Sequence, residues 1–140
     1  MWLDPCTWAF PVSTVTLSAT NSHPNVTIRL RKGVAIPIRV EDTSGLLDRH
    51  EGKTPGAVLL LGLSRQASPF RSATTLSRDA NGRNYQVVVP FATPLKLLLS
   101  SSFFKVSDGT GVPLIGPASK AALLPILVPA GVQPAAVRFV

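Results

Sequence analysis

The sequence predicts an all-β fold, a β-sandwich of about seven to nine mostly antiparallel strands. Apolar and polar side chains alternate along several short segments, as in strands with one buried face. Thirteen prolines and ten glycines are spread through the 140 residues and separate these segments. With 45% hydrophobic and 15% charged residues, the chain is not disordered, and its length fits a single domain, residues 1–140, with its own core.

In the first half of the chain, four segments are expected to be strands. Thr14–Ser18 and Asn25–Leu30 alternate strictly between apolar and polar residues. The next segment, Val34–Asp42, continues this pattern but contains Pro37, which cannot donate a hydrogen bond to a neighbouring strand. We therefore expect this strand at a sheet edge or with a bulge. Ala57–Arg65 is continuously apolar, which favours a central strand buried on both faces.

The second half of the chain is expected to contain further strands and at most one short helix. Only residues 116–124, GPASKAALL, combine helix-favouring alanines with a serine, Ser119, that can cap a helix. The expected strands are residues 72–77, 85–91, 94–106 (one long or two short strands), 122–129 and 135–140.

The stretch DANG, residues 79–82, predicts a tight turn between two strands. Asp79 and Asn81 have short polar side chains that can bond to nearby backbone amides, and Gly82 can adopt the positive φ that such a turn requires. The valines that follow pack well on a pleated sheet, and Pro90 ends the strand.

This turn and its flanking strands resemble the carboxypeptidase regulatory-like domain, a transthyretin-like or Ig-like β-sandwich. The resemblance covers about residues 33–106 and is carried by IPIRVEDTSG (Ile36–Gly45), PGAVLLLGL (Pro55–Leu63), DANGRNYQV (Asp79–Val87) and VPFATPLKLLLS (Val89–Ser100). The chain departs from the family pattern where PFATPLK replaces a PxGxY bend, and where the connection between Gly45 and Pro55 is longer than usual.

The resemblance implies a non-enzymatic spacer, scaffold or adhesion domain of a secreted or cell-surface bacterial protein. Its partners would be other domains of the parent chain or other protein chains. Two alternatives stay open: a self-assembling fibre or oligomer subunit that pairs strand edges, and a hydrolase-associated accessory domain.

Both ends of the sequence are unusually apolar, which suggests a fragment of a longer chain or an end completed by a partner. Trp2 near the start and Phe139 near the finish are therefore candidate interface residues. Phe104 is a third, because two adjacent phenylalanines in a strand must point to opposite faces. Alternatively, the two ends pair with each other inside one sandwich.

No catalytic, cofactor-binding or metal-binding residue is predicted. Asp48, His50 and Glu51 lie close in sequence but lack further ligands at metal-binding spacing, so we interpret them as a solvated loop. The DANG turn imitates the head of a calcium loop without its final glutamate. Cys6 is the single cysteine, and no serine lies in a G-x-S-x-G motif.

The net charge of +7 is interpreted as an ordinary basic surface and not as a nucleic-acid site, because most arginines and lysines are dispersed near turns. The longest apolar run is broken by prolines and is shorter than the ~18 residues that a membrane helix needs. We therefore expect no membrane insertion.

Overall fold

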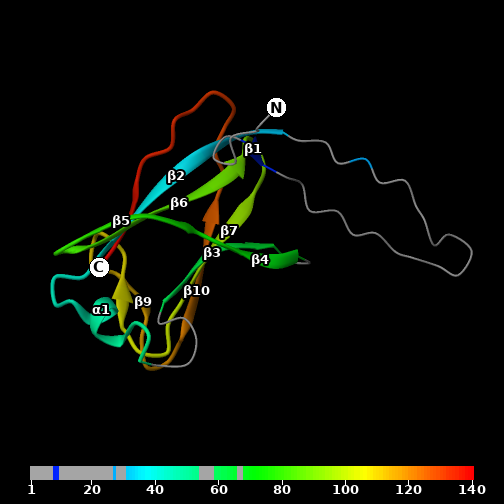
Figure 1. The fold of residues 1–140 in the computed structure, drawn as a ribbon. Coiled ribbons are helices and arrows are strands. Elements are labelled where there is room, and N and C mark those ends of the chain that lie inside the picture. Colours follow the sequence, from blue (N-terminus) through cyan, green and yellow to red (C-terminus); the bar gives the residue numbers. More distant parts are fainter. Residues whose placement is uncertain (1–7, 10–26, 28–30, 54–58, 66–67) are drawn as a thin grey trace, which may run out of the picture.

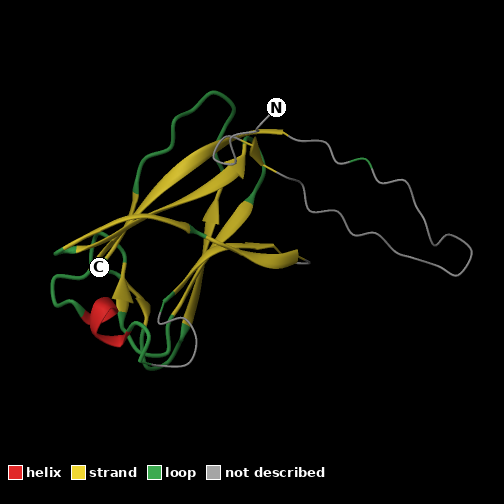
Figure 2. Ribbon diagram, in the orientation of Figure 1, coloured by secondary structure: helices red, strands yellow, loops and turns green. Residues whose placement is uncertain are grey.

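The computed structural model describes residues 8–9, 27, 31–53, 59–65 and 68–140. This part of the chain contains eleven strands and one short helix, which confirms the predicted all-β fold (Figures 1 and 2). Four of the strands are only two or three residues long, which is why the number exceeds the expected seven to nine. Among the described strands, β2 and β11 form the one parallel pair.

The first sheet is built around β2 (Arg31–Glu41), the longest strand. β2 pairs along its length with β6 (Gly82–Pro90), and β6 pairs with β5 (Thr74–Asp79). The other edge of β2 is covered near its two ends, by β1 (Trp8–Ala9) and by β11 (Val137–Phe139).

The second sheet has the order β10-β7-β3-β4, and all its pairs are antiparallel. Its strands are β3 (Leu60–Arg65), β4 (Ser68–Ser72), β7 (Leu95–Ser100) and β10 (Ala121–Ile126). A small pair, β8 (Val106–Ser107) and β9 (Pro113–Ile115), lies at the same end of the molecule as the helix (Figure 1).

One hydrophobic core lies between the two sheets. β2 and β6 contribute Ile36, Ile38, Val87 and Val89, because alternate residues of a strand point to the same face. Leu61, Leu97 and Leu99 come from the second sheet, and Phe139 of β11 packs among them. Each fully buried side chain of this size contributes about 1.5–3 kcal/mol through the hydrophobic effect.

Pro37 lies neither in an edge strand nor at a bulge, so that expectation was wrong. β2 is an inner strand and pairs with β6 without a register shift. On its other edge, however, β1 reaches only Lys32 and β11 begins at Ile38. Pro37 therefore occupies a gap where no described strand needs its missing amide.

The short helix considered for residues 116–124 does not form, because residues 121–124 belong to β10. Pairing with the neighbouring β7 decides the conformation here and overrides the local preference of alanine for helix. The helix that does form, α1 (Leu46–His50), lies in the polar connection after β2.

Other expected strands agree with the structure or lie outside it. The continuously apolar segment supplies β3, an inner strand between β7 and β4. The predicted segment 94–106 contains β7 and the first residue of β8, with residues 101–105 between the two strands. The buried hydroxyl of Ser101 accepts hydrogen bonds from the amides of Phe103 and Phe104 at 3.1 Å. Thr14–Ser18 lies outside the described residues, and so does Asn25–Leu30 apart from Thr27.

Candidate functional site

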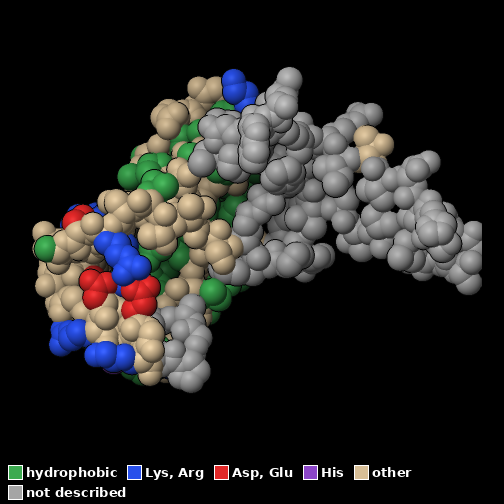
Figure 3. Space-filling view, viewed as in Figure 1, with side chains coloured by type: hydrophobic (Ala, Val, Ile, Leu, Met, Phe, Trp, Pro, Cys, Tyr) green, Lys and Arg blue, Asp and Glu red, His purple; other side chains and the backbone are tan. Residues whose placement is uncertain are grey.

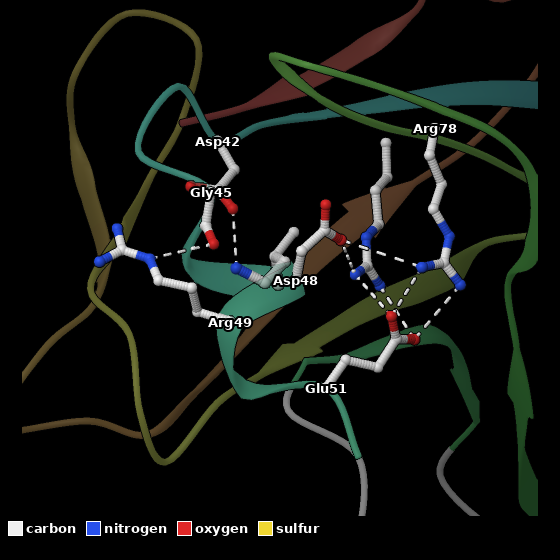
Figure 4. Close-up of polar contacts among 8 residues, drawn as sticks. Asp42, Gly45, Asp48, Arg49, Glu51 and Arg78 are labelled. Atoms are coloured by element: carbon white, nitrogen blue, oxygen red, sulfur yellow. Dashed lines mark hydrogen bonds and ion pairs between the residues drawn. The ribbon is translucent and has the colours of Figure 1, made fainter. Parts of the chain in front are cut away.

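Several charged side chains meet beside α1, whose Leu47 is buried in the core. Asp48 and Glu51, from the helix and its end, meet Arg78 of β5 and Arg83 of β6 (Figure 4). Acidic and basic side chains lie next to one another on this part of the surface (Figure 3). These four side chains are called the ion-pair cluster below.

Asp42 explains why a helix of only five residues forms here. Its carboxylate accepts hydrogen bonds from the Leu47 amide at 2.7 Å and from the Ser44 hydroxyl at 3.1 Å, and its backbone carbonyl accepts one from the Gly45 amide. Burial by itself raises the pKa of Asp42, but the backbone amides of Leu47 and its neighbours and the Ser44 hydroxyl outweigh this and lower it. The buried Leu47 then anchors the helix on the core.

Arg83 occupies a position of β6 that points into the sandwich. It pairs with Val40 on β2, and its neighbours on the same face are Tyr85 and Val87. The residue is only 9% exposed, and its guanidinium reaches Asp48 at 2.5 Å and Glu51 at 2.9 Å. Burial alone lowers the pKa of Arg83, but the hydrogen bonds to these carboxylates outweigh it, so the side chain stays charged.

One atom of this arginine is unsatisfied. The Nε of Arg83 is buried and has no hydrogen-bond partner among the described residues. A buried donor without a partner costs about 1–3 kcal/mol, so an acceptor that reached it would be bound favourably.

The cluster is electrically balanced and its carboxylates are engaged. Arg78 donates to Glu51 at 2.7 Å and also lies 3.9 Å from Asp48. Two carboxylates thus face two guanidinium groups, and their ion pairs fasten α1 and its C-terminal end to β5 and β6.

A pocket of about 300 Å³ lies beside the cluster. Its lining includes polar side chains of the cluster, Glu51 and Arg83, together with the aromatic Tyr85. Ser72 and Thr75, at the crossing from β4 to β5, line it as well. The pocket therefore offers both hydrogen-bond donors and acceptors.

The predicted turn at residues 79–82 is present, and it joins β5 to β6. Gly82 has a φ of 145°, which confirms the predicted positive φ, and a Cβ built there would lie 2.1 Å from the carbonyl oxygen of Val40. Asp79 accepts a hydrogen bond from the Asn81 amide at 2.8 Å. Its ion pair with Arg39, at 2.7 and 2.8 Å, together with that amide lowers the pKa of Asp79 to about 2.

The three candidate interface residues have different surroundings. Phe139 is 1% exposed within the core, so its side chain does not lie on the surface. Phe104 is half-buried, packs against the core and contacts the His50 ring edge-on at 5.7 Å, while the neighbouring Phe103 is exposed. Trp2 lies outside the described residues.

The residues weighed as metal ligands are engaged in other contacts. His50 packs on Phe103 and Phe104, and both Asp48 and Glu51 are paired with arginines. Among the residues that the structure describes, no group of three His, Cys, Asp or Glu side chains could hold a metal ion.

Sequence reasoning missed the arginines of the cluster, which it placed on a solvated surface. The sequence does contain an indication that Arg83 points inward. Along the strand it lies in step with Tyr85, Val87 and Val89, and alternate residues of a strand share one face. Nothing comparable indicates Arg78, whose partner Glu51 lies 27 residues earlier.

No protein-family model, no curated protein and no solved structure matches this chain. The fold therefore defines a class, an all-β protein of sandwich-like architecture, and no family. None of the described helices has the length and apolar character needed to cross a membrane.

Proposed function

We propose that this chain is a non-enzymatic β-sandwich module that acts by binding another protein surface. The observation that carries the proposal is the segment 121–137, from β10 to the start of β11, which is called the uncharged segment below. It contains no charged residue in a chain of net charge +7. Leu123, Leu127 and Val132 within it are 50%, 60% and 47% exposed.

The uncharged segment forms one edge of the second sheet and the connection to the first. In β10 the partly buried residues Ala122, Leu124 and Ile126 face the core, and Leu123 points outward. Leu98 of β7 lies directly beside Leu123, so apolar side chains continue across two strands. Contiguous exposed apolar surface of this kind marks contact sites in soluble proteins.

The free edge of β10 favours side-chain packing over the addition of a further strand. Amides of the residues around β7 donate to the carbonyls of Lys120 and Val128, so the even-numbered residues of β10 face β7. The odd-numbered residues, including Pro125, therefore turn their backbone groups toward the free edge. Pro125 has no backbone N–H, so it cannot donate a hydrogen bond to a further strand at that edge.

The chain itself carries a matching apolar surface, so a second copy is the simplest partner. A relation to the carboxypeptidase regulatory-like domains, and the extracellular or cell-surface location that it implies, are parts of this proposal that rest on sequence resemblance alone.

Sedimentation of the purified chain at increasing concentration tests the proposal. We expect reversible association, with a Kd on the order of 100 μM, because the apolar surface is modest in area. The double variant Leu123→Lys/Leu127→Lys should stay monomeric, because two like-charged groups would face each other across the contact.

Leu76→Lys is the matched control. Leu76 is 55% exposed and lies on β5, at the opposite edge of the fold, so this variant should associate like the unmodified chain. A chain that remains monomeric up to about 1 mM would refute self-association. If Leu76→Lys lost association while Leu123→Lys/Leu127→Lys kept it, the contact would lie at β5 and not at β10.

A further inference from the structure

The pocket beside the ion-pair cluster has the composition of a ligand site that the proposed protein contact does not use. It shares no residue with the uncharged segment. Its volume of about 300 Å³ is at the lower end of the range for small-molecule sites, so it fits a ligand of one ring and not a longer molecule.

The charges around the pocket select against an ionic ligand. Arg83 and Glu51 both line it, and each is already paired within the cluster. An anion would have to replace Glu51 beside Arg83, and a cation would have to replace Arg83 beside Glu51. A neutral group that both donates and accepts hydrogen bonds can address both residues without breaking their ion pair.

A hydroxyl group meets that requirement. It can donate to the Glu51 carboxylate and accept from a nitrogen of the Arg83 guanidinium, because both side chains line the pocket. Ser72 and Thr75 also line the pocket, and their hydroxyls can bond further hydroxyls of the same ligand.

The remaining lining suits the C–H faces of a saturated ring. Leu47 and Leu61 contribute apolar surface, and the Tyr85 ring lies on the β6 side.

We propose that this pocket binds a small neutral polyhydroxylated molecule, of the size of a single sugar ring. Arg83 and Glu51 bind its hydroxyl groups at one end, Thr75 and Ser72 bind them at the other, and the leucines and Tyr85 contact the ring. Binding of this kind is weak for an isolated ring, with a Kd in the millimolar range.

Two-dimensional ¹H–¹⁵N NMR of the full chain tests the inference with D-glucose, D-galactose and myo-inositol as probes, and sodium acetate as an anionic comparison. At least one polyol should cause saturable shifts at about 1–10 mM. These shifts should centre on Glu51, Ser72, Thr75 and the β6 residues Arg83 and Tyr85, and acetate should not reproduce them.

Thr75→Val and Thr74→Val form a matched pair of variants. Both replace a threonine by a residue of the same shape on β5, but Thr75 pairs with the inward Tyr85 and lines the pocket, whereas Thr74 pairs with Gln86. Loss of one hydrogen bond should weaken binding about fivefold in Thr75→Val, and Thr74→Val should bind as the unmodified chain does.

Three results would overturn the inference. The first is the absence of saturable shifts for all three polyols up to about 100 mM, where even very weak sites are occupied. The second is binding of acetate at these residues without binding of a polyol. The third is an equal effect of the two threonine variants, which would place the ligand elsewhere. Each result concerns the pocket alone and leaves the association experiment unaffected.

Discussion

The two edge strands β5 and β10 are held in the fold by opposite kinds of interaction. All six residues of β5 are exposed, a bulge interrupts its register at Leu76, and ion pairs tie Arg78 and Asp79 to neighbouring elements. β10 has a regular register, no charged residue and a row of partly buried apolar side chains.

The two edge strands therefore differ in how well they are protected against contact with another chain. Charges and a bulge make β5 a poor template for another chain, which is the usual protection of an edge strand. β10 has only Pro125 as protection, and the outward Leu123 and the following Leu127 remain available for contact. We therefore expect the stability of β5 to depend on turn geometry and pH, and that of β10 to depend on apolar burial.

The largest expected effect comes from Gly82, which fixes the turn of the β5–β6 hairpin. Gly82→Ala places a Cβ 2.1 Å from the Val40 carbonyl oxygen, at a φ that side chains rarely adopt. We expect a loss of about 3 kcal/mol or more in the free energy of unfolding, measured with urea.

Gly131→Ala is the control for backbone strain without a clash. Gly131 also has a positive φ, of 75°, but a Cβ there would meet no atom within 4 Å. This variant should lose only about 1 kcal/mol. Equal losses for the two variants would show that the close approach to Val40 is absent in solution.

The next effect tests which face of β10 is buried. Leu124→Ala removes a side chain that packs against the core and should cost about 2 kcal/mol, whereas Leu123→Ala, on the outward face, should cost about 0.5 kcal/mol or less. Urea unfolding of both variants measures the difference. A larger loss for Leu123→Ala would mean that Leu123, and not Leu124, faces the core, as after a register shift of one residue.

The smallest expected effect is the pH dependence of the β5 edge. Because the folded pKa of Asp79 is about 2, below its ordinary value, its ion pair with Arg39 stabilises the fold above about pH 4. This contribution is lost as the pH falls from about 4 toward 2. Glu41 also has a lowered pKa, owing to its hydrogen bonds with Arg138, so part of the acid sensitivity belongs to β2 and β11.

Hydrogen exchange of individual amides, corrected for the intrinsic effect of pH, measures this loss strand by strand. Protection in β5 should decrease below about pH 4, while protection in β10, which has no titrating side chain, should decrease less. Asp79→Asn should have the lower β5 protection above about pH 4, and the difference should disappear as the pH falls toward 2. An identical pH response of β5 and β10 would contradict the proposed difference.

Local pattern was sufficient to predict the parts of the fold in which neighbouring residues determine the structure. The alternation in residues 34–42 predicted the core face of β2, where Ile36, Ile38 and Val40 are buried, because side chains of a strand point alternately to its two faces. The sequence DANG predicted the hairpin, because few residues other than glycine tolerate the φ of Gly82.

The cluster and α1 were not predictable in the same way. The helix depends on the Asp42 carboxylate and on burial of Leu47, and a five-residue helix has too few internal hydrogen bonds to be recognised from propensity. The partners of Arg83 lie 32 and 35 residues earlier in the chain, so only the tertiary fold brings them together.

The parallel pairing of β11 with β2 also determines when the first sheet can be completed during synthesis. Arg138 binds Glu41 across a separation of 97 residues, and Phe139 enters the core from the same strand. A ribosome-bound chain that has reached β10 can already form the β5–β6 hairpin, but the edge of β2 stays open until β11 emerges. Contacts at this separation slow folding, so the nascent chain exposes an apolar edge for the whole of that interval.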